Sequence, residues 1–163
     1  VSRYDTTDGR QIPLEMRIGI LDRKLRVINE NTRDRVNWKK YALTAVKSTY
    51  GFEWQGDNLL IARENILYSI KDYYEARFNE APDEGFMEEC AEVISWNIWQ
   101  MDGLTFGLPG YTVKEQVLSA DSLFSSDVFN EGLKPQERYC IFMDWVKNKS
   151  ITYRSLVADI KRP

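Results

Sequence analysis

Residues 48–58, with the sequence STYGFEWQGDN, constrain the fold of this chain more than any other stretch. Aromatic residues alternate there with small or charged ones, and aromatic side chains favour a packed β-strand. Gly56 allows a bend with positive φ, and Asp57 or Asn58 can accept hydrogen bonds from the first free N–H groups of a helix. The stretch therefore predicts a buried strand, a tight turn and the start of a long helix.

Glu53 is the last residue of this predicted strand. In open α/β sheets, ligands bind beyond the carboxyl ends of parallel strands. Glu53 is therefore our first candidate for a ligand-binding residue. The pattern alone is also compatible with, and by itself favours, a solvated acid at the end of an ordinary strand–helix unit.

The chain has 163 residues, which is long enough for one domain with a hydrophobic core. We expect a single domain over residues 1–163, with a polar N-terminal segment at 1–13 and a folded core at about 14–157. Periodic apolar residues predict four helices. The helices cover Leu14–Ile28, about Val36–Lys47, about Asn58–Phe78 and a segment after Pro82. Residues 139–145 are interpreted as a strand or a buried segment, and residues 151–157 as a strand that can pair back on them in a hairpin.

The charge distribution does not by itself indicate a nucleic-acid-binding protein. The formal net charge is −3, whereas DNA-binding domains usually carry a basic face. Basic residues nevertheless crowd the first quarter of the chain, and we interpret them as the solvated sides of two helices. They are Arg17, Arg23, Lys24, Arg26, Arg33, Arg35, Lys39 and Lys40.

Several site classes are disfavoured by residue content. The chain has no histidine, which excludes histidine as a general base or metal ligand. Cys90 and Cys140 are too far apart in sequence for a C-x-x-C zinc motif, and such cysteines suit a reducing, cytoplasmic setting. No apolar run approaches the ~20 residues that span a bilayer. We therefore expect neither a bound metal nor a membrane partner.

Residues 95–105, with the sequence SWNIWQMDGLT, form the second informative stretch. They predict a helix end, a short strand and a turn at Asp102-Gly103. The pattern is also compatible with a buried aromatic segment that ends in an ordinary Asp-Gly turn.

Both stretches resemble conserved blocks of the adenine-specific (N6), S-adenosylmethionine-dependent DNA methyltransferases of restriction–modification systems and phages. The run from Tyr41 to Asn58, followed by Ile61-Ala62-Arg63, is similar to the second block. There, an acid at a strand end binds the ribose hydroxyls of the cofactor, and Glu53 occupies that position. Residues 95–105 are similar to the third block, in which an Asp accepts from the exocyclic amine of the cofactor adenine, and Asp102 matches it.

The resemblance implies a fold and a set of cofactor-binding residues. The fold would be α/β and helix-rich, a partial Rossmann-like (class I methyltransferase-like) sheet flanked by long helices. Glu53, Trp54, Asp102 and Gly103 would contact S-adenosylmethionine, with Trp54 packed beside the adenine. An ionised carboxylate suits these contacts because it only accepts hydrogen bonds.

Two blocks that carry chemistry in the family are not found in this sequence. Residues 4–13 contain a single glycine and no G-x-G loop, and the sequence has no Asn-Pro-Pro-Tyr. We assign no catalytic residue and leave open whether the chain is an enzyme on its own. The expected partners are DNA and a complementary protein chain or a homo-oligomer. The alternative is a non-catalytic, anti-restriction-like phage protein that acts on restriction–modification enzymes and keeps the same scaffold.

Overall fold

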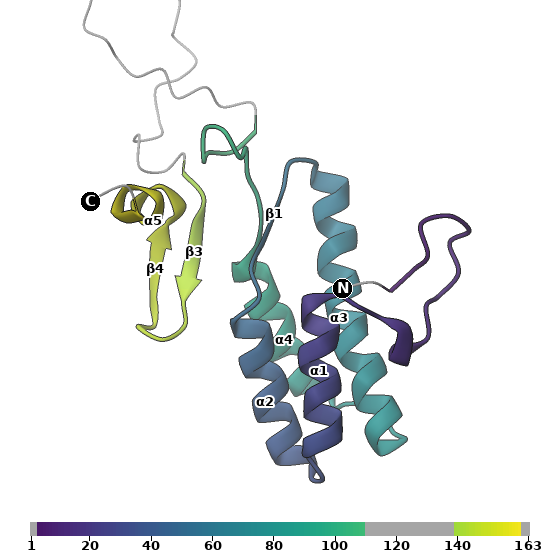
Figure 1. The fold of residues 1–163 in the computed structure, drawn as a ribbon. Helices are drawn as coiled ribbons and strands as arrows, with labels where there is room; N and C mark the ends of the chain where they lie inside the picture. Colours follow the sequence, from purple (N-terminus) through teal and green to yellow (C-terminus); the bar gives the residue numbers. More distant parts are fainter. Residues whose placement is uncertain (1–2, 110–138, 161–163) are drawn as a thin grey trace, which may run out of the picture. The chain divides into compact units, whose positions relative to one another are not determined.

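The computed structural model describes residues 3–109 and 139–160. The chain divides into two compact units, Val1–Trp99 and Gln100–Pro163. Helices predominate, and the described strands form two small two-stranded sheets (Figure 1). The mixed, helix-rich class expected from the sequence is therefore present at this coarse level, and the expectation of a single domain stays a prediction.

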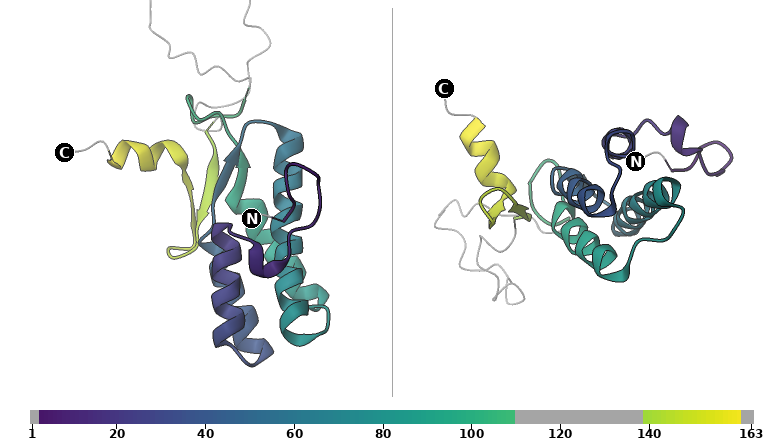
Figure 2. Two further views of the ribbon diagram at one scale, coloured as in Figure 1. Left: turned by 45° about the vertical axis from the view of Figure 1, so that its right-hand side comes forward. Right: turned by 90° about the horizontal axis from the view of Figure 1, so that it is seen from below.

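Four helices that run alternately up and down make up most of the first unit (Figures 1 and 2). They are α1 (Ile20–Asn31), α2 (Arg35–Lys47), α3 (Gly56–Phe78) and α4 (Glu84–Asn97). Helix α1 packs against α2 and α3, and α4 packs against the same two helices. The four helices therefore surround one core. The helices predicted from periodicity at 36–47 and 58–78 are confirmed to within a few residues.

Two short strands follow the ends of α2 and α4. They are β1 (Gly51–Glu53), which connects α2 to α3, and β2 (Ile98–Gln100), and they form a two-stranded sheet. Because α2 and α4 run in the same direction, the strands leave the same end of the helix bundle (Figure 1). Glu53, the last residue of β1, therefore lies beyond that end.

Trp38 on α2 lies at the centre of the core and is fully buried. Its ring meets Tyr74 edge-to-face with centroids 5.1 Å apart, and it makes similar contacts with Phe78 and Phe86. Its Nε1–H donates to Asn29 Oδ1 at 2.6 Å. Edge-to-face pairs stabilise a core beyond simple burial, and this cluster connects α1, α2, α3 and the start of α4.

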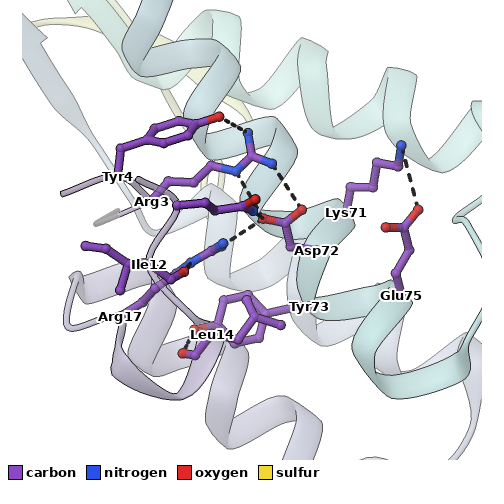
Figure 3. Close-up of polar contacts among 10 residues, drawn as sticks. Arg3, Tyr4, Ile12, Leu14, Arg17, Lys71, Asp72, Tyr73 and Glu75 are labelled. Carbon is purple, nitrogen blue, oxygen red and sulfur yellow. Dashed lines mark hydrogen bonds and ion pairs between the residues drawn. The ribbon is translucent and has the colours of Figure 1, made fainter. Parts of the chain in front are cut away.

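Asp72 on α3 holds the N-terminal segment against the bundle (Figure 3). Its carboxylate accepts from Arg3 Nε at 3.0 Å and from Arg17 Nη1 at 2.9 Å. Arg17 is 1% exposed, and its Nε donates to Ile12 O at 2.9 Å. Burial alone would lower the pKa of Arg3, but the hydrogen bond and charge of Asp72 raise it above its ordinary value. The polar segment is thus bound to the bundle by a partly buried ion-pair network.

Helix α1 begins at Ile20, later than the periodicity predicts. Leu14–Met16 form a separate turn of 3-10 helix, η1, and Arg17 then adopts extended backbone. The break lets the Arg17 side chain turn inward to Asp72. Ile18, expected on the apolar face of the helix, is 71% exposed. That part of the predicted helix is wrong, because burial of a charged side chain with its partner overrides the apolar spacing.

Two aspartates cap the helices that they precede. Asp34 Oδ1 accepts from the N–H of Asn37 at 2.9 Å, and Asp83 Oδ1 accepts from the N–H of Phe86 at 3.0 Å. The hydrogen bond from Asn37 lowers the pKa of Asp34. The hydrogen bond from Lys39, followed by that from Phe86, lowers the pKa of Asp83. Both caps therefore bind best when the carboxyl group is ionised.

We expect the stability of the first unit to fall in acid. Because both carboxyl pKa values are lowered in the folded state, their contribution is complete above the unfolded pKa of 3.8 and is lost as the pH falls through the folded pKa. Urea unfolding at neutral pH and at about pH 3 measures this loss. The double variant Asp34→Asn, Asp83→Asn keeps two capping side chains without the charge. An unchanged pH dependence in that variant would contradict the assignment.

The second unit contains a hairpin and a helix. They are β3 (Ile141–Asp144), β4 (Lys149–Thr152) and α5 (Tyr153–Ile160). The strands are antiparallel, with Ile141 opposite Thr152, so the predicted hairpin is confirmed. Asn148 has a φ of 50° in the connecting turn, a conformation that Asn tolerates. The extension of the second strand to residue 157 is wrong, because α5 begins at Tyr153, whose ring packs on Phe142.

Candidate functional site

A groove of about 540 Å³ runs alongside β1 in the first unit. It lies between the start of α1, the strand and the first turns of α3. Its apolar lining includes Ile20, Phe52, Ile61, Ile66 and Ile98. Polar groups come from Thr49, Glu53, Asn58 and Asn65. A mostly apolar groove of this volume with a few polar groups is typical of small-molecule sites.

Helix α3 contributes one continuous face to the groove. Asn58, Ile61, Ala62, Asn65 and Ile66 all line it, and their spacing of three, four, seven and eight residues places them on one side of a helix. Sequence reasoning did not name Asn65 as a site residue. The sequence does contain a signal for Asn65: it follows Asn58 by seven residues, so both lie on the same face of a helix.

Glu53 lies in the groove and also holds the junction between β1 and α3. Its Oε1 accepts from the main-chain N–H of Trp54 at 2.9 Å and of Gln55 at 3.1 Å. Within the described residues, Oε2 takes no hydrogen bond. One carboxylate oxygen is thus committed to the turn, and the other can accept from a ligand.

The start of α3 differs from the expectation. Gln55 is the residue that precedes the helix, and its side chain makes no capping bond to the main chain. Gly56 is already helical and does not have positive φ. The predicted bend at Gly56 and the predicted cap by Asp57 or Asn58 are therefore wrong. Glu53 accepts from the N–H groups of Trp54 and Gln55, just before the helix. The turn therefore needs no glycine bend and no cap from Asp57 or Asn58.

The aromatic residues of the β1 region are less buried than predicted. Tyr50, Phe52 and Trp54 are 41%, 36% and 53% exposed. Alternation of aromatic residues favours a strand but does not indicate which of its faces is buried. Trp54 is not among the residues that line the groove, and its position beside a cofactor adenine stays a prediction.

Asp102 and Gly103 lie in the second unit, in a turn that follows β2. Asp102 Oδ1 accepts from the N–H of Leu104 at 2.8 Å, and this bond lowers the pKa of Asp102. The N–H of Phe106 donates to Asp102 O at 2.8 Å. Gly103 is exposed, and a Cβ there would meet nothing within 4 Å. The turn predicted at these residues is confirmed, and Asp102 is ionised at neutral pH.

The structure thus brings the sequence-predicted site residues together in two separate pairs. Glu53 and Trp54 are adjacent at the end of β1, and Asp102 and Gly103 are adjacent in the turn after β2. Because the two pairs belong to different compact units, the convergence of Glu53 and Asp102 on one nucleoside stays a prediction.

Two polar side chains fix the elements around the groove, Arg63, which is half-buried, and Asn97, which is buried. Arg63 Nη2 and Nε donate to Ile98 O at 2.7 and 3.0 Å, so a cation lies at the carboxyl end of α4, where it also favours the helix dipole. Asn97 Nδ2 donates to the main-chain oxygens of Val46, Lys47 and Thr49 at 2.9–3.2 Å. These bonds hold the end of α2 and the approach to β1 against the end of α4.

Most of the basic cluster noted in the sequence is engaged within the chain. Arg17 pairs with Asp72, Arg35 with Glu80, and Lys39 with Asp83. Lys24 donates to Ser48, and Arg26 donates to the main-chain oxygens of Leu14 and Arg17. The interpretation as solvated helix faces is wrong for Arg17, which is buried, whereas Arg35 is exposed and fits it. Arg23, Arg33 and Lys40 are exposed as well. Arg17, Arg35 and Lys39 are balanced by carboxylates, whereas Lys24 and Arg26 donate to neutral oxygens and keep their positive charge.

Comparisons with known proteins, and searches of the described residues for metal sites and membrane helices, do not narrow the function. Comparison of the chain with protein-family models, with curated proteins and with solved structures finds no match. Among residues 3–109 and 139–160, no cluster of His, Cys, Asp or Glu could hold a metal ion. No helix in these ranges has the length and apolar character needed to cross a membrane. The function must therefore be argued from the groove itself.

Proposed function

We propose that this chain is the central, S-adenosylmethionine-binding part of a DNA adenine-N6 methyltransferase of the restriction–modification or phage type, acting in the cytoplasm. In this proposal β1 and β2 are neighbouring strands of a partial Rossmann-like sheet. Glu53 accepts from the cofactor ribose hydroxyls and Asp102 from the adenine amine, with Trp54 and Gly103 beside them. The observation that carries the proposal is the open carboxylate oxygen of Glu53 in an apolar groove.

The chemistry of the groove supports a nucleoside ligand. A nucleoside presents a flat apolar base and a ribose with two neighbouring hydroxyl donors. Glu53 Oε2 is an acceptor, and Ile20, Phe52 and Ile61 provide apolar surface within the same groove. Asn58 and Asn65 add amide groups that can donate or accept. The volume of about 540 Å³ is of the size that encloses a ligand of this class.

The chain alone should bind the cofactor without transferring its methyl group. The sequence contains neither a G-x-G loop before α1 nor an Asn-Pro-Pro-Tyr block, and transfer to adenine requires a pocket for a flipped base. A complementary protein chain would have to supply both blocks and the main DNA contacts. Robust methylation of DNA by the purified chain in a radiolabel assay would contradict this part of the proposal.

Calorimetric titration with S-adenosylmethionine tests the binding site. We expect micromolar binding that weakens at least tenfold, or about 1.4 kcal/mol, in Glu53→Gln and in Asp102→Ala. Glu53→Gln is informative because its amide oxygen can still accept from Trp54 and Gln55, whereas its NH₂ group replaces the acceptor that faces the ligand. Glu64→Ala, an exposed acid of α3 outside the groove, serves as the control. Unchanged binding in both site variants would refute the assigned roles.

A second candidate is a non-catalytic interaction protein on the same scaffold. The observation that favours it is the exposure of Tyr50, Phe52 and Trp54, because tyrosine and tryptophan are enriched at binding hot spots. This candidate predicts no heat with S-adenosylmethionine and a stable complex with a restriction–modification enzyme. The same calorimetric titration therefore separates the two functions.

A further inference from the structure

A second groove lies between α1 and α2 in the first unit. The two helices lie side by side and run in opposite directions (Figure 1). The groove has a volume of about 690 Å³, and its lining is mostly apolar. Val27 and Ile28 of α1 and Tyr41 and Ala45 of α2 supply apolar surface. The groove shares no lining residue with the one beside β1, so it is separate from the proposed cofactor site.

Helix α1 carries apolar side chains on two sides. Leu21 and Leu25 are buried in the core of the bundle, whereas Val27 lines the groove and is exposed. Across the groove, the Tyr41 ring of α2 is exposed as well. A surface helix ordinarily buries one apolar stripe and presents polar residues on its opposite side. Contiguous exposed apolar surface instead marks a binding surface for another molecule.

Two cations line the same groove without a carboxylate partner among the described residues. Lys24 Nζ donates to Ser48 Oγ at 2.8 Å and to Ser48 O at 3.1 Å, and both acceptors are neutral. The Arg23 side chain is exposed and makes no hydrogen bond or ion pair with any described residue. The groove therefore combines an apolar lining with unbalanced positive charge.

The neighbouring charged side chains do not cancel this charge. Glu30 lies three residues after Val27, on the same side of α1, and is exposed. Lys40 lies four residues before Thr44, on the groove side of α2, and is also exposed. Together with the two cations of the groove, these side chains carry three positive charges and one negative charge. The electrostatic complement of this surface is an acidic partner.

We propose that the groove between α1 and α2 binds an amphipathic helix of a partner protein, with acidic residues flanking its apolar stripe. The stripe would cover Val27 and Tyr41, and the acidic residues would lie beside Arg23 and Lys24. The dimensions fit, because the groove follows α1 from Arg23 to Asn31, a rise of about 12 Å. An amphipathic helix presents anchors at i, i+3 or i+4, and i+7 over about 10 Å.

A nucleic acid fits the same groove less well. Phosphate groups would pair with Arg23 and Lys24, but they would leave the apolar side chains of Val27 and Tyr41 without a complementary surface. An acidic amphipathic helix fills the apolar groove and matches its charge at once. The interaction goes beyond cofactor binding and gives the chain a protein partner of defined chemistry.

Fluorescence anisotropy with designed peptides tests this surface. The first peptide is a labelled amphipathic helix with a leucine stripe and flanking glutamates, and the second carries lysines in place of the glutamates. A third peptide keeps the glutamates and has glutamines in place of the leucines. We expect micromolar binding of the first peptide at about 0.1 M salt, and binding at least tenfold weaker for each of the others. Failure of the first peptide to bind, or equal binding of the first two, overturns the proposal.

Protein variants test whether the peptide lies in this groove. Val27→Glu places an acid on the apolar surface and should weaken binding of the first peptide at least tenfold. Arg23→Glu should weaken binding of the first peptide and strengthen binding of the lysine peptide. The control is Leu60→Glu on α3, at an exposed position outside both grooves, which should bind like the original chain. Equal losses in Val27→Glu and Leu60→Glu would refute the assignment to this groove.

Two further probes and one titration separate the other interpretations. Duplex DNA or dodecanoate that binds this groove while the first peptide does not would overturn the proposal, in favour of a nucleic acid or a small anionic amphiphile. S-adenosylmethionine should bind Val27→Glu and the original chain equally well, because the two grooves share no lining residue. Failure of the helix-binding groove can therefore be told apart from failure of the cofactor site.

Discussion

Replacing Asp72 with alanine is expected to lower the free energy of unfolding by about 3–5 kcal/mol, the range for breaking a buried ion pair from one side. Asp72 is the acceptor for Arg3 and Arg17, and the Arg17 side chain is 1% exposed. Without the carboxylate, the Arg17 charge would remain buried with no counter-charge among these contacts. Urea unfolding followed by tryptophan fluorescence measures the loss.

The matched control for Asp72 lies one turn further along α3. Glu75 forms an exposed pair with Lys71 at 3.7 Å, and exposed pairs of this kind are weak. Glu75→Ala should therefore change the free energy of unfolding by less than about 0.5 kcal/mol. A loss below about 1 kcal/mol in Asp72→Ala would show that the N-terminal segment contributes little to the bundle.

Replacing Asn97 with alanine should cost about 2–4 kcal/mol, because it removes the donor to the main-chain oxygens of Val46, Lys47 and Thr49 in a buried site. The change should also appear in amide chemical shifts from Thr49 to Gly51, since the bonds position the approach to β1. Thermal and urea unfolding give the energetic part of the effect.

Asn31 offers a control of the same residue type. Its Nδ2 donates to Val27 O at 2.8 Å from an exposed position at the end of α1. Asn31→Ala should fall within about 0.5 kcal/mol of the original chain. Equal losses in the two variants would mean that the bonds of Asn97 do not hold the end of α2 against α4.

Elements with strong local signals were predictable, and long-range polar contacts were not. The apolar period of α2 and α3 identified both helices, and a run of aromatic residues identified β1. In contrast, the contact between Arg3 and Asp72 spans 69 positions of sequence, and no local pattern marks it. The inward turn of Arg17, which follows η1 and delays α1, depends on a second long-range contact, from Arg17 to Asp72 across 55 positions.

The candidate site was predictable in part for a similar reason. The strand-end position of Glu53 follows from local pattern, and so does the Asp102-Gly103 turn. The apolar groove beside Glu53 depends on how α1 and α3 pack at the end of the bundle, which alternation within β1 does not specify. The same limit explains why Tyr50, Phe52 and Trp54 were expected to be buried.

Glu53 has two possible tasks in one side chain, because Oε1 accepts from the amides of Trp54 and Gln55 and leaves Oε2 as the acceptor for a ligand. A molecule that binds Oε2 also restrains the carboxylate that closes this junction. Occupancy should therefore be readable without any enzymatic assay, as slower hydrogen–deuterium exchange at those two amides. Unaltered exchange at a saturating ligand concentration would mean that the ligand is held elsewhere.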